Sequence, residues 1–258
     1  WYSNQKKHYY YLMHRYQVLI EYHGTLFVGW QIQKKGNSIQ KVIQLTLSKL
    51  LKQKIILYGS GRTDAGVHAL EQSAHFDVKN KIQNINKLIK SLNFFLNKKM
   101  ISIINIKNKT SNFHARYSAK ERSYIYVIQN RLSPSTLNKD KEWHIRKKLD
   151  LNLIKKGSAK LIGTHDFSTF RSSNCNSKSP VRTINKIIIT KSKNRIKLKF
   201  TSKSFLKNQV RSMVGCLKYL GEKKWNLKKF EDVFKKKDRR KVAPPAPACG
   251  LYLEKIIY

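Results

Sequence analysis

Acidic residues are scarce in this chain of 258 residues. It has 14 aspartates and glutamates against 54 lysines and arginines, a formal net charge of +40. So large a positive excess favours a polyanionic partner, most simply nucleic acid. Lysine, asparagine and isoleucine are used heavily throughout, so the codon bias of an AT-rich genome is a second explanation for part of the excess. The sign of the charge suits RNA under either explanation.

Cysteine is also scarce, and the three residues present, Cys175, Cys216 and Cys249, lie far apart in the sequence. This spacing gives neither a disulfide framework nor a Cys-x-x-Cys metal site. The histidines have no metal-ligand spacing with these cysteines, so we expect no metal. A reducing, cytoplasmic compartment fits this use of cysteine best.

Long hydrophobic runs are missing, and no apolar stretch approaches the length needed to cross a membrane. No apolar segment typical of a secretion signal opens the sequence, so we do not expect a secreted protein. Residues 1–14 are aromatic and basic without periodicity, and we expect them to form a poorly ordered lead-in. The hydrophobic content of 40% is enough for one large domain or two of ordinary size.

Glycine is sparse, with 11 residues, yet three glycines fall within eight positions, in Gly59-Ser60-Gly61-Arg62-Thr63-Asp64-Ala65-Gly66. Glycine allows tight turns and close approach of the backbone. Apolar segments with strand character flank the stretch at 55–58 and 69–78. A sharp loop between two strands would present the carboxylate of Asp64 at a surface. An ordinary hairpin turn is the plainer interpretation of an isolated Asp-Ala-Gly.

The periodicity of apolar residues predicts the element order β-α-β-β-α-β twice. Good N-cap residues precede four of the expected helices, at Ser38, Asn84, Asp150 and Asn226. The expected strands are 16–22, 55–58, 69–78, 101–106, 123–129, 182–190, 195–202 and 251–257, and the expected helices are 39–51, 85–96, 151–162, 205–220 and 227–234. This order predicts an α+β fold of two ferredoxin-like (RRM-like) halves around a central RNA-binding cleft. We expect an N-terminal domain at 15–112, which carries the Asp64 loop, and a C-terminal domain at 113–258.

The string Gly61-Arg62-Thr63-Asp64-Ala65-Gly66-Val67-His68-Ala69 closely resembles the catalytic motif of the tRNA pseudouridine synthase A family, whose members act on the anticodon stem-loop. Further segments resemble family motifs at 22–31, 114–126, 163–171, 205–215 and 250–253. The resemblance runs from about Tyr16 to Leu253, nearly the whole chain. Two departures are His23, where the family usually has Asp, and Gln209, where it usually has Met.

The resemblance implies roles for four residues. Asp64 would be the nucleophile, and Arg211 would form an ion pair with it that keeps the carboxylate ionised. Tyr124 would stack on the target uracil, and Arg62 would help displace the target base and fill its place. Without the motif, Tyr124 on an alternating strand would more often be a core residue, and Arg211 would be an ordinary arginine on a helix surface.

The resemblance also implies the reaction, the isomerisation of uridine to pseudouridine at tRNA positions 38, 39 and 40. The N-glycosidic bond is cleaved, the uracil turns, and it is rejoined through C5. No redox step or group transfer occurs, so no cofactor is expected. Asp64 attacks the base or the sugar, or assists a glycal route; the sequence leaves these open. The implied partners are tRNA and a second copy of the chain, as a homodimer, and no membrane is implied.

Three alternatives stay open. The closest is a pseudouridine synthase for other tRNA or mRNA positions. A non-catalytic RNA-binding protein is the second, although it would have no need of the carboxylate of Asp64. A hydrolase that uses paired carboxylates is the third, and the scarcity of acidic residues, with no second acid near Asp64, argues against it.

Overall fold

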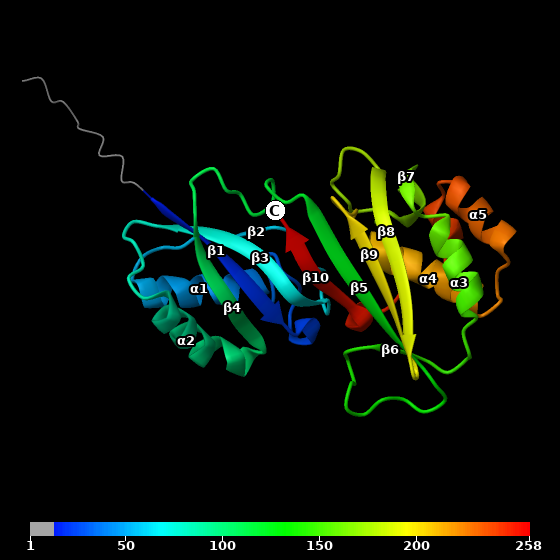
Figure 1. Ribbon diagram of the computed structural model, residues 1–258, viewed down its shortest axis with the longest axis horizontal. Coiled ribbons are helices and arrows are strands. Elements are labelled where there is room, and N and C mark those ends of the chain that lie inside the picture. The colour runs from blue at the N-terminus through cyan, green and yellow to red at the C-terminus, as the bar shows by residue number, and fades with distance from the viewer. Residues whose placement is uncertain (1–12) are drawn as a thin grey trace, which may run out of the picture.

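A mixed sheet of ten strands runs through residues 13–258, the part of the chain that the computed structural model describes. Its strands are β1 (His14–Tyr22), β2 (Tyr58–Gly59), β3 (His68–Val78), β4 (Ile101–Lys109), β5 (Glu121–Asn130), β6 (Trp143–Ile145), β7 (Gly163–Asp166), β8 (Val181–Ser192), β9 (Arg195–Ser202) and β10 (Leu251–Ile257). The main path has the order β4-β1-β3-β10-β5-β9-β8-β7, with β2 paired to β3 and β6 to β5 (Figure 1). The fold is therefore a mixed α/β fold built on one large sheet.

Five α-helices lie against this sheet in the described part of the chain: α1 (Ile39–Leu51), α2 (Ile85–Leu96), α3 (Leu151–Ala159), α4 (Gln209–Gly221) and α5 (Leu227–Lys235). Figure 1 shows α1 and α2 beside the N-terminal strands, and α3, α4 and α5 beside β8 and β9. Helical spacing buries one stripe of α1 and of α2, formed by Ile39, Ile43, Leu47, Leu88, Leu92 and Leu96. Alternation buries one face of β1, formed by Tyr16, Val18, Ile20 and Tyr22.

The predicted helix starts are confirmed at the four N-cap residues. The side chains of Ser38, Asn84, Asp150 and Asn226 each accept a hydrogen bond from a backbone N–H two or three residues later. The predicted start of the helix at 205 is wrong, because α4 begins at Gln209. Asn208 lies before it in the left-handed region, with φ of 63°, and this conformation interrupts a helix.

The predicted strand at 55–58 is reduced to β2, only Tyr58 and Gly59. Side chains of α1 take the hydrogen bonds that a neighbouring strand would have made: Ser48 accepts from the N–H of Ile55, and Gln44 accepts from the N–H of Leu57. The strands β6 and β7 were not expected. Both are short, and each pairs with the strand next to it along the chain across a connection without strand character.

The predicted lead-in at 1–14 falls mostly on residues 1–12, which lie outside the described residues. His14 is already part of β1, where it pairs with Val78. The first strand therefore begins one residue before the expected start of the N-terminal domain.

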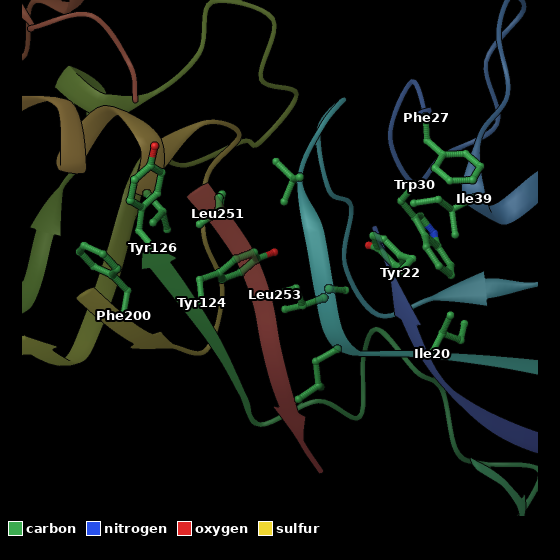
Figure 2. Close-up of a cluster of buried hydrophobic side chains, with 14 of the residues drawn as sticks. Ile20, Tyr22, Phe27, Trp30, Ile39, Tyr124, Tyr126, Phe200, Leu251 and Leu253 are labelled. Carbon is green, nitrogen blue, oxygen red and sulfur yellow. The ribbon is translucent and has the colours of Figure 1, made fainter. Parts of the chain in front are cut away.

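The last strand, β10, connects the N-terminal and C-terminal strands into one sheet. It pairs along its length with β5 in antiparallel fashion, and in parallel with β3 at Tyr252–His68 and Leu253–Ala69. Beyond these two pairs β3 has β2 as its neighbour instead. The sheet consequently opens between β3 and β10, and the segment between β2 and β3, which contains Asp64, lies at this opening. Figure 2 shows buried side chains on both sides of it, Tyr22 and Trp30 on one and Tyr124 and Leu253 on the other.

Candidate active site

The glycine-rich stretch forms a tight turn that begins at Asp64. The N–H of Val67 donates to the carbonyl oxygen of Asp64 at 3.1 Å. Gly66, the third residue of this turn, has φ of +77°, a conformation in which glycine costs little and other residues are strained. The loop predicted from the glycine spacing is therefore present, and its geometry requires glycine at position 66.

Thr63, the residue before Asp64, is held in place by hydrogen bonds of both its backbone and its side chain. The carbonyl oxygen of Thr63 accepts from the N–H of Trp30 at 3.1 Å, and its hydroxyl lies 2.8 Å from the hydroxyl of Tyr22. Gly29 allows this close approach, since a Cβ there would lie 2.6 Å from the carbonyl oxygen of Thr63. The segment 22–31 thus holds the turn rigidly against the N-terminal strands.

Asp64 and Arg211 come together from distant parts of the sequence. Nη1 of Arg211 on α4 lies 3.9 Å from Oδ2 of Asp64, and the two side chains are 19% and 28% exposed. The Arg211 guanidinium is held by a hydrogen bond from Nε to the carbonyl oxygen of Ala246 at 2.7 Å. The carboxylate is therefore partly open to solvent, with a cation fixed at one side.

Tyr124 lies on β5, and its ring is 9% exposed. The ring meets that of Phe205 edge to face, with centroids 5.2 Å apart. Its hydroxyl oxygen lies 3.8 Å from the position that a Cβ at Gly61 would take. The pKa of Tyr124 is raised to about 12, chiefly by burial; Arg122 lowers it and the charge of Asp64 raises it by smaller amounts. The phenol is therefore neutral at physiological pH and lies against the Asp64 loop.

Arg62 lies on the same loop, but the structure does not bring it to Asp64. Its side chain is exposed, and no ion pair among residues 13–258 involves it. Arg116 and Lys203, two further exposed cations, lie on the segments that meet around the loop. The rim of the site is therefore basic, which suits contact with phosphate groups.

Arg122 is the residue at this site that sequence analysis missed. Its guanidinium is buried and donates to the backbone carbonyls of Ser60, Arg116 and Lys203. The sequence did carry a signal for it. Arg122 lies two residues before Tyr124 in a predicted strand, so both side chains share the buried face, and a charged side chain there needs hydrogen-bond partners.

His68, the histidine of the motif, is buried and connects segments of the chain through hydrogen bonds. Its Nδ1 accepts from the N–H of Gly24 at 3.0 Å, so Nε2 carries the proton, and Nε2 lies 3.0 and 3.1 Å from the carbonyl oxygens of Asp140 and Cys249. Burial lowers the pKa of His68 to about 4. The neutral ring joins the start of β3 to two distant segments.

Neither a metal cluster nor a membrane span is found in the described part of the chain. Residues 13–258 contain no group of three or more His, Cys, Asp and Glu side chains arranged to hold a metal ion. None of the helices among these residues has the length and apolar character that crossing a membrane requires.

Known proteins resemble the chain over most of its length. The sequence model of a family described as tRNA pseudouridine synthase matches residues 18–118 and 158–258, which include Arg62, Asp64 and Arg211. The tRNA pseudouridine synthase A of Pelagibacter ubique (strain HTCC1062) is 64% identical over 246 residues, 95% of this chain and 100% of that protein. The tRNA pseudouridine synthase A of Parvibaculum lavamentivorans (strain DS-1) is 40% identical over 246 residues, with the same coverage. The chain therefore belongs to the tRNA pseudouridine synthase family.

Proposed function

We propose that this protein, an RNA-modifying isomerase by its family, converts uridine to pseudouridine at positions 38, 39 and 40 in the anticodon stem-loop of tRNA, with Asp64 as the nucleophile. The observation that carries the proposal is the position of Asp64. It begins a rigid turn, stays partly open to solvent, and has Arg211 3.9 Å away. The names of both relatives, tRNA pseudouridine synthase A, support tRNA as the substrate.

The reaction breaks the bond between the ribose and N1 of uracil and forms a bond to C5, while the C5 proton is released and N1 gains one. An ionised carboxylate can attack the ribose or the base, or assist a glycal route. The neutral Tyr124 ring beside the loop offers an aromatic surface for the turning base. The net change is an isomerisation, so we expect no cofactor.

A uridine within a helical stem must leave the stack before the enzyme can reach it. Arg62 is exposed on the turn that carries Asp64 and is suited to fill the vacated position, because a guanidinium stacks on bases and binds phosphate. By family resemblance we also propose a homodimer in which one tRNA contacts both subunits. The free cysteines Cys175, Cys216 and Cys249 support a reducing cytoplasm.

We further propose that residues 15–112 and 113–258 are two ferredoxin-like domains with the RNA-binding cleft between them. The order β4-β1-β3-β2 supports this for the first domain, and the order β10-β5-β9-β8 supports it for the second. Numbered along the chain within each domain, the four strands have the spatial order 4-1-3-2 in both cases. This is the strand order of a ferredoxin-like sheet.

The test is tritium release from tRNA labelled at C5 of uridine, in metal-free buffer, with wild type and Asp64→Ala. Release by wild type alone, mapped to positions 38–40, is the expected result. Release mapped elsewhere would favour the synthase for other positions. Tight binding of tRNA without release would favour a binding protein, and release that survives Asp64→Ala would mean that another group is the nucleophile.

A further inference from the structure

Arg122 is a buried cation without a carboxylate partner in the described part of the chain. It lies on β5, is 9% exposed, and forms no ion pair among residues 13–258. Its guanidinium instead donates to three backbone carbonyls: Nη2 to those of Ser60 at 3.0 Å and Arg116 at 2.9 Å, and Nη1 to that of Lys203 at 2.6 Å. Burying an arginine is costly unless its donors are satisfied, so this arrangement calls for an explanation.

The three acceptors lie on three different parts of the chain. Ser60 directly follows β2 and opens the loop of Asp64. Arg116 lies in the connection between β4 and β5, and Lys203 directly follows β9. A planar guanidinium presents donors in fixed directions and can bind all three, whereas a lysine ammonium is a single point on a flexible stem.

Arg122 also faces the same way as Tyr124, because residues two apart on a strand share a face. A Cβ at Gly61 would lie 3.9 Å from Nε of Arg122 and 3.8 Å from the hydroxyl of Tyr124. The backbone of the Asp64 loop therefore runs directly against both side chains. On its other side the loop is bound to β3, since Gln72 donates to the carbonyl oxygen of Gly61 at 2.8 Å.

We propose that Arg122 is a positioning residue for pseudouridine formation, which fixes the loop that carries Asp64 against the strand that carries Tyr124. The contact with Ser60 crosses the opening between β3 and β10, where β-ladder hydrogen bonds no longer join the two sides. The inference rests on the proposed roles of Asp64 and Tyr124. Arg122 itself is buried and reaches no substrate, so it acts on the reaction only through the geometry of the loop.

The expected kinetic effect is a fall in kcat with little change in tRNA affinity. A misplacement of about 1 Å at a reacting group can cost roughly 100-fold in rate. We expect Arg122→Lys to lower the single-turnover rate of tritium release by about that factor, while the Kd for tRNA stays within about threefold because the phosphate-facing cations are unchanged. Arg15→Lys is the control for the loss of an arginine bound to the β4–β5 connection, since Arg15 donates to the carbonyls of Ser111 and Phe113 as well as pairing with Asp77.

Two further measurements separate positioning from general stability. Methylguanidinium added to Arg122→Ala should restore part of the lost rate, because it can occupy the space left by the side chain, and should not accelerate wild type or Arg15→Ala. Hydrogen exchange at residues 60–66 should speed up in Arg122→Lys and not in Arg15→Lys. If Arg122→Ala does not fold, the rate and the hydrogen exchange of Arg122→Lys still test the proposal.

The outcomes distinguish this inference from the proposed function. Wild-type rate and unchanged loop exchange in Arg122→Lys would overturn the inference, whatever Asp64→Ala does. A weaker tRNA Kd with unchanged kcat would also overturn it, since Arg122 would then serve RNA binding. Full activity of Asp64→Ala would instead overturn the proposed nucleophile, and the loop exchange would still decide whether Arg122 fixes the loop.

Discussion

Arg211 contacts Asp64 at 3.9 Å, which is a long distance for a hydrogen bond and short enough for a strong electrostatic effect in a partly buried site. Exposed ion pairs contribute about 0–1 kcal/mol to folding, and the length of this partly buried pair does not suggest a much larger contribution, so a role in chemistry explains it better than a role in stability. The hydrogen bond from Arg211 to the carbonyl oxygen of Ala246 fixes where the charge lies. The Arg211 guanidinium thus uses one nitrogen to bind a carbonyl oxygen and another to face the carboxylate. Lysine has a single nitrogen and cannot do both.

We expect Arg211→Lys to lower the single-turnover rate by about 10- to 100-fold with little change in melting temperature, because a preorganised cation at a reacting group is worth a few kcal/mol. Tritium release and thermal unfolding measure the two effects. Arg240→Lys is the control, an exposed arginine whose ion pair is with Asp238. An Arg211→Lys enzyme with wild-type rate would contradict a role for this pair in the reaction.

The buried His68 predicts a loss of stability in mild acid. Its pKa is held at about 4, below the ordinary 6.5 of an unfolded histidine, chiefly by burial and secondarily by the nearby His23, against hydrogen bonds to Cys249 and Asp140 that raise it. Between these values the unfolded chain binds more protons than the folded one, so stability falls as pH drops from 6.5 to 4 and levels off below. The loss is on the order of 2–3 kcal/mol for this one group.

Urea unfolding of wild type and His68→Gln at pH 7, 6 and 5 measures this effect. Glutamine keeps a donor and an acceptor but does not titrate, so the free energy of unfolding should depend less steeply on pH in the variant. His75→Gln should behave likewise, because burial also lowers the pKa of His75 to about 4. Parallel pH curves for wild type and His68→Gln would mean that His68 does not titrate in this range.

Among the elements, those with local signals could be predicted from the sequence. The N-caps Ser38 and Asn84 and the apolar stripes that follow them are contained within a dozen residues, and α1 and α2 begin where expected. The strands β6 and β7 have no such signal, because they exist through pairing with β5 and β8. The strand β2 is short because side chains of α1 bind the backbone before it, and α4 starts late because Asn208 is left-handed. The periodicity of apolar residues predicts neither effect.

The candidate site likewise has parts that could be predicted from local sequence and parts that could not. The turn at Asp64 could be predicted because glycine spacing reflects backbone geometry directly. The contact between Asp64 and Arg211 joins residues far apart in the sequence, and only the family resemblance suggested it. The position of Arg122 on the face of Tyr124 was a signal that it needs partners, but the partners themselves could not be predicted, since they are backbone carbonyls and a backbone carbonyl leaves no trace in residue identity.

The turn itself gives a prediction about Gly66. An alanine there must adopt φ of +77°, which costs about 1–2 kcal/mol, and its Cβ would lie 3.2 Å from that of Ala248. We expect Gly66→Ala to lose both stability and most activity, because the strain falls on the turn that holds Asp64. Thermal unfolding and tritium release measure the two.

Gly163→Ala is the matched control for this variant. Gly163 also has a positive φ, +105°, but lies at the start of β7 near the edge of the sheet. It should lose a similar amount of stability and retain its rate below the melting temperature. Equal loss of activity in both variants would mean that Gly66 matters only for stability.

The two sets of strands form one sheet because β10 pairs with both. Leu253, fully buried, pairs with Ala69 of β3 on one side and with Tyr124 of β5 on the other. The strand that follows the Asp64 loop, β3, and the strand that carries Tyr124, β5, are thus the two neighbours of β10. The site lies where the sheet stops being continuous, and its geometry depends on β10 at one end of the opening and on Arg122 within it.

The large positive charge of the chain can be divided by experiment into a part that binds RNA and a part that does not. The logarithm of the tRNA binding constant should fall linearly with the logarithm of salt concentration, with a slope set by the number of phosphates neutralised. Arg62, Arg116 and Lys203 border the site, so neutralising each to Gln should reduce that slope by roughly one.

Exposed lysines on α2, Lys87 and Lys90, are the control, because this helix packs beside the N-terminal strands away from the Asp64 loop (Figure 1). Their replacement by Gln should leave both the slope and the Kd unchanged, as expected of charge that reflects codon bias. If the α2 variants lowered the slope as much as those at the rim, the tRNA would contact the helical side of the protein, and the proposed cleft would be the wrong surface. If none of them changed the slope, the affinity would come from cations elsewhere on the open face of the sheet.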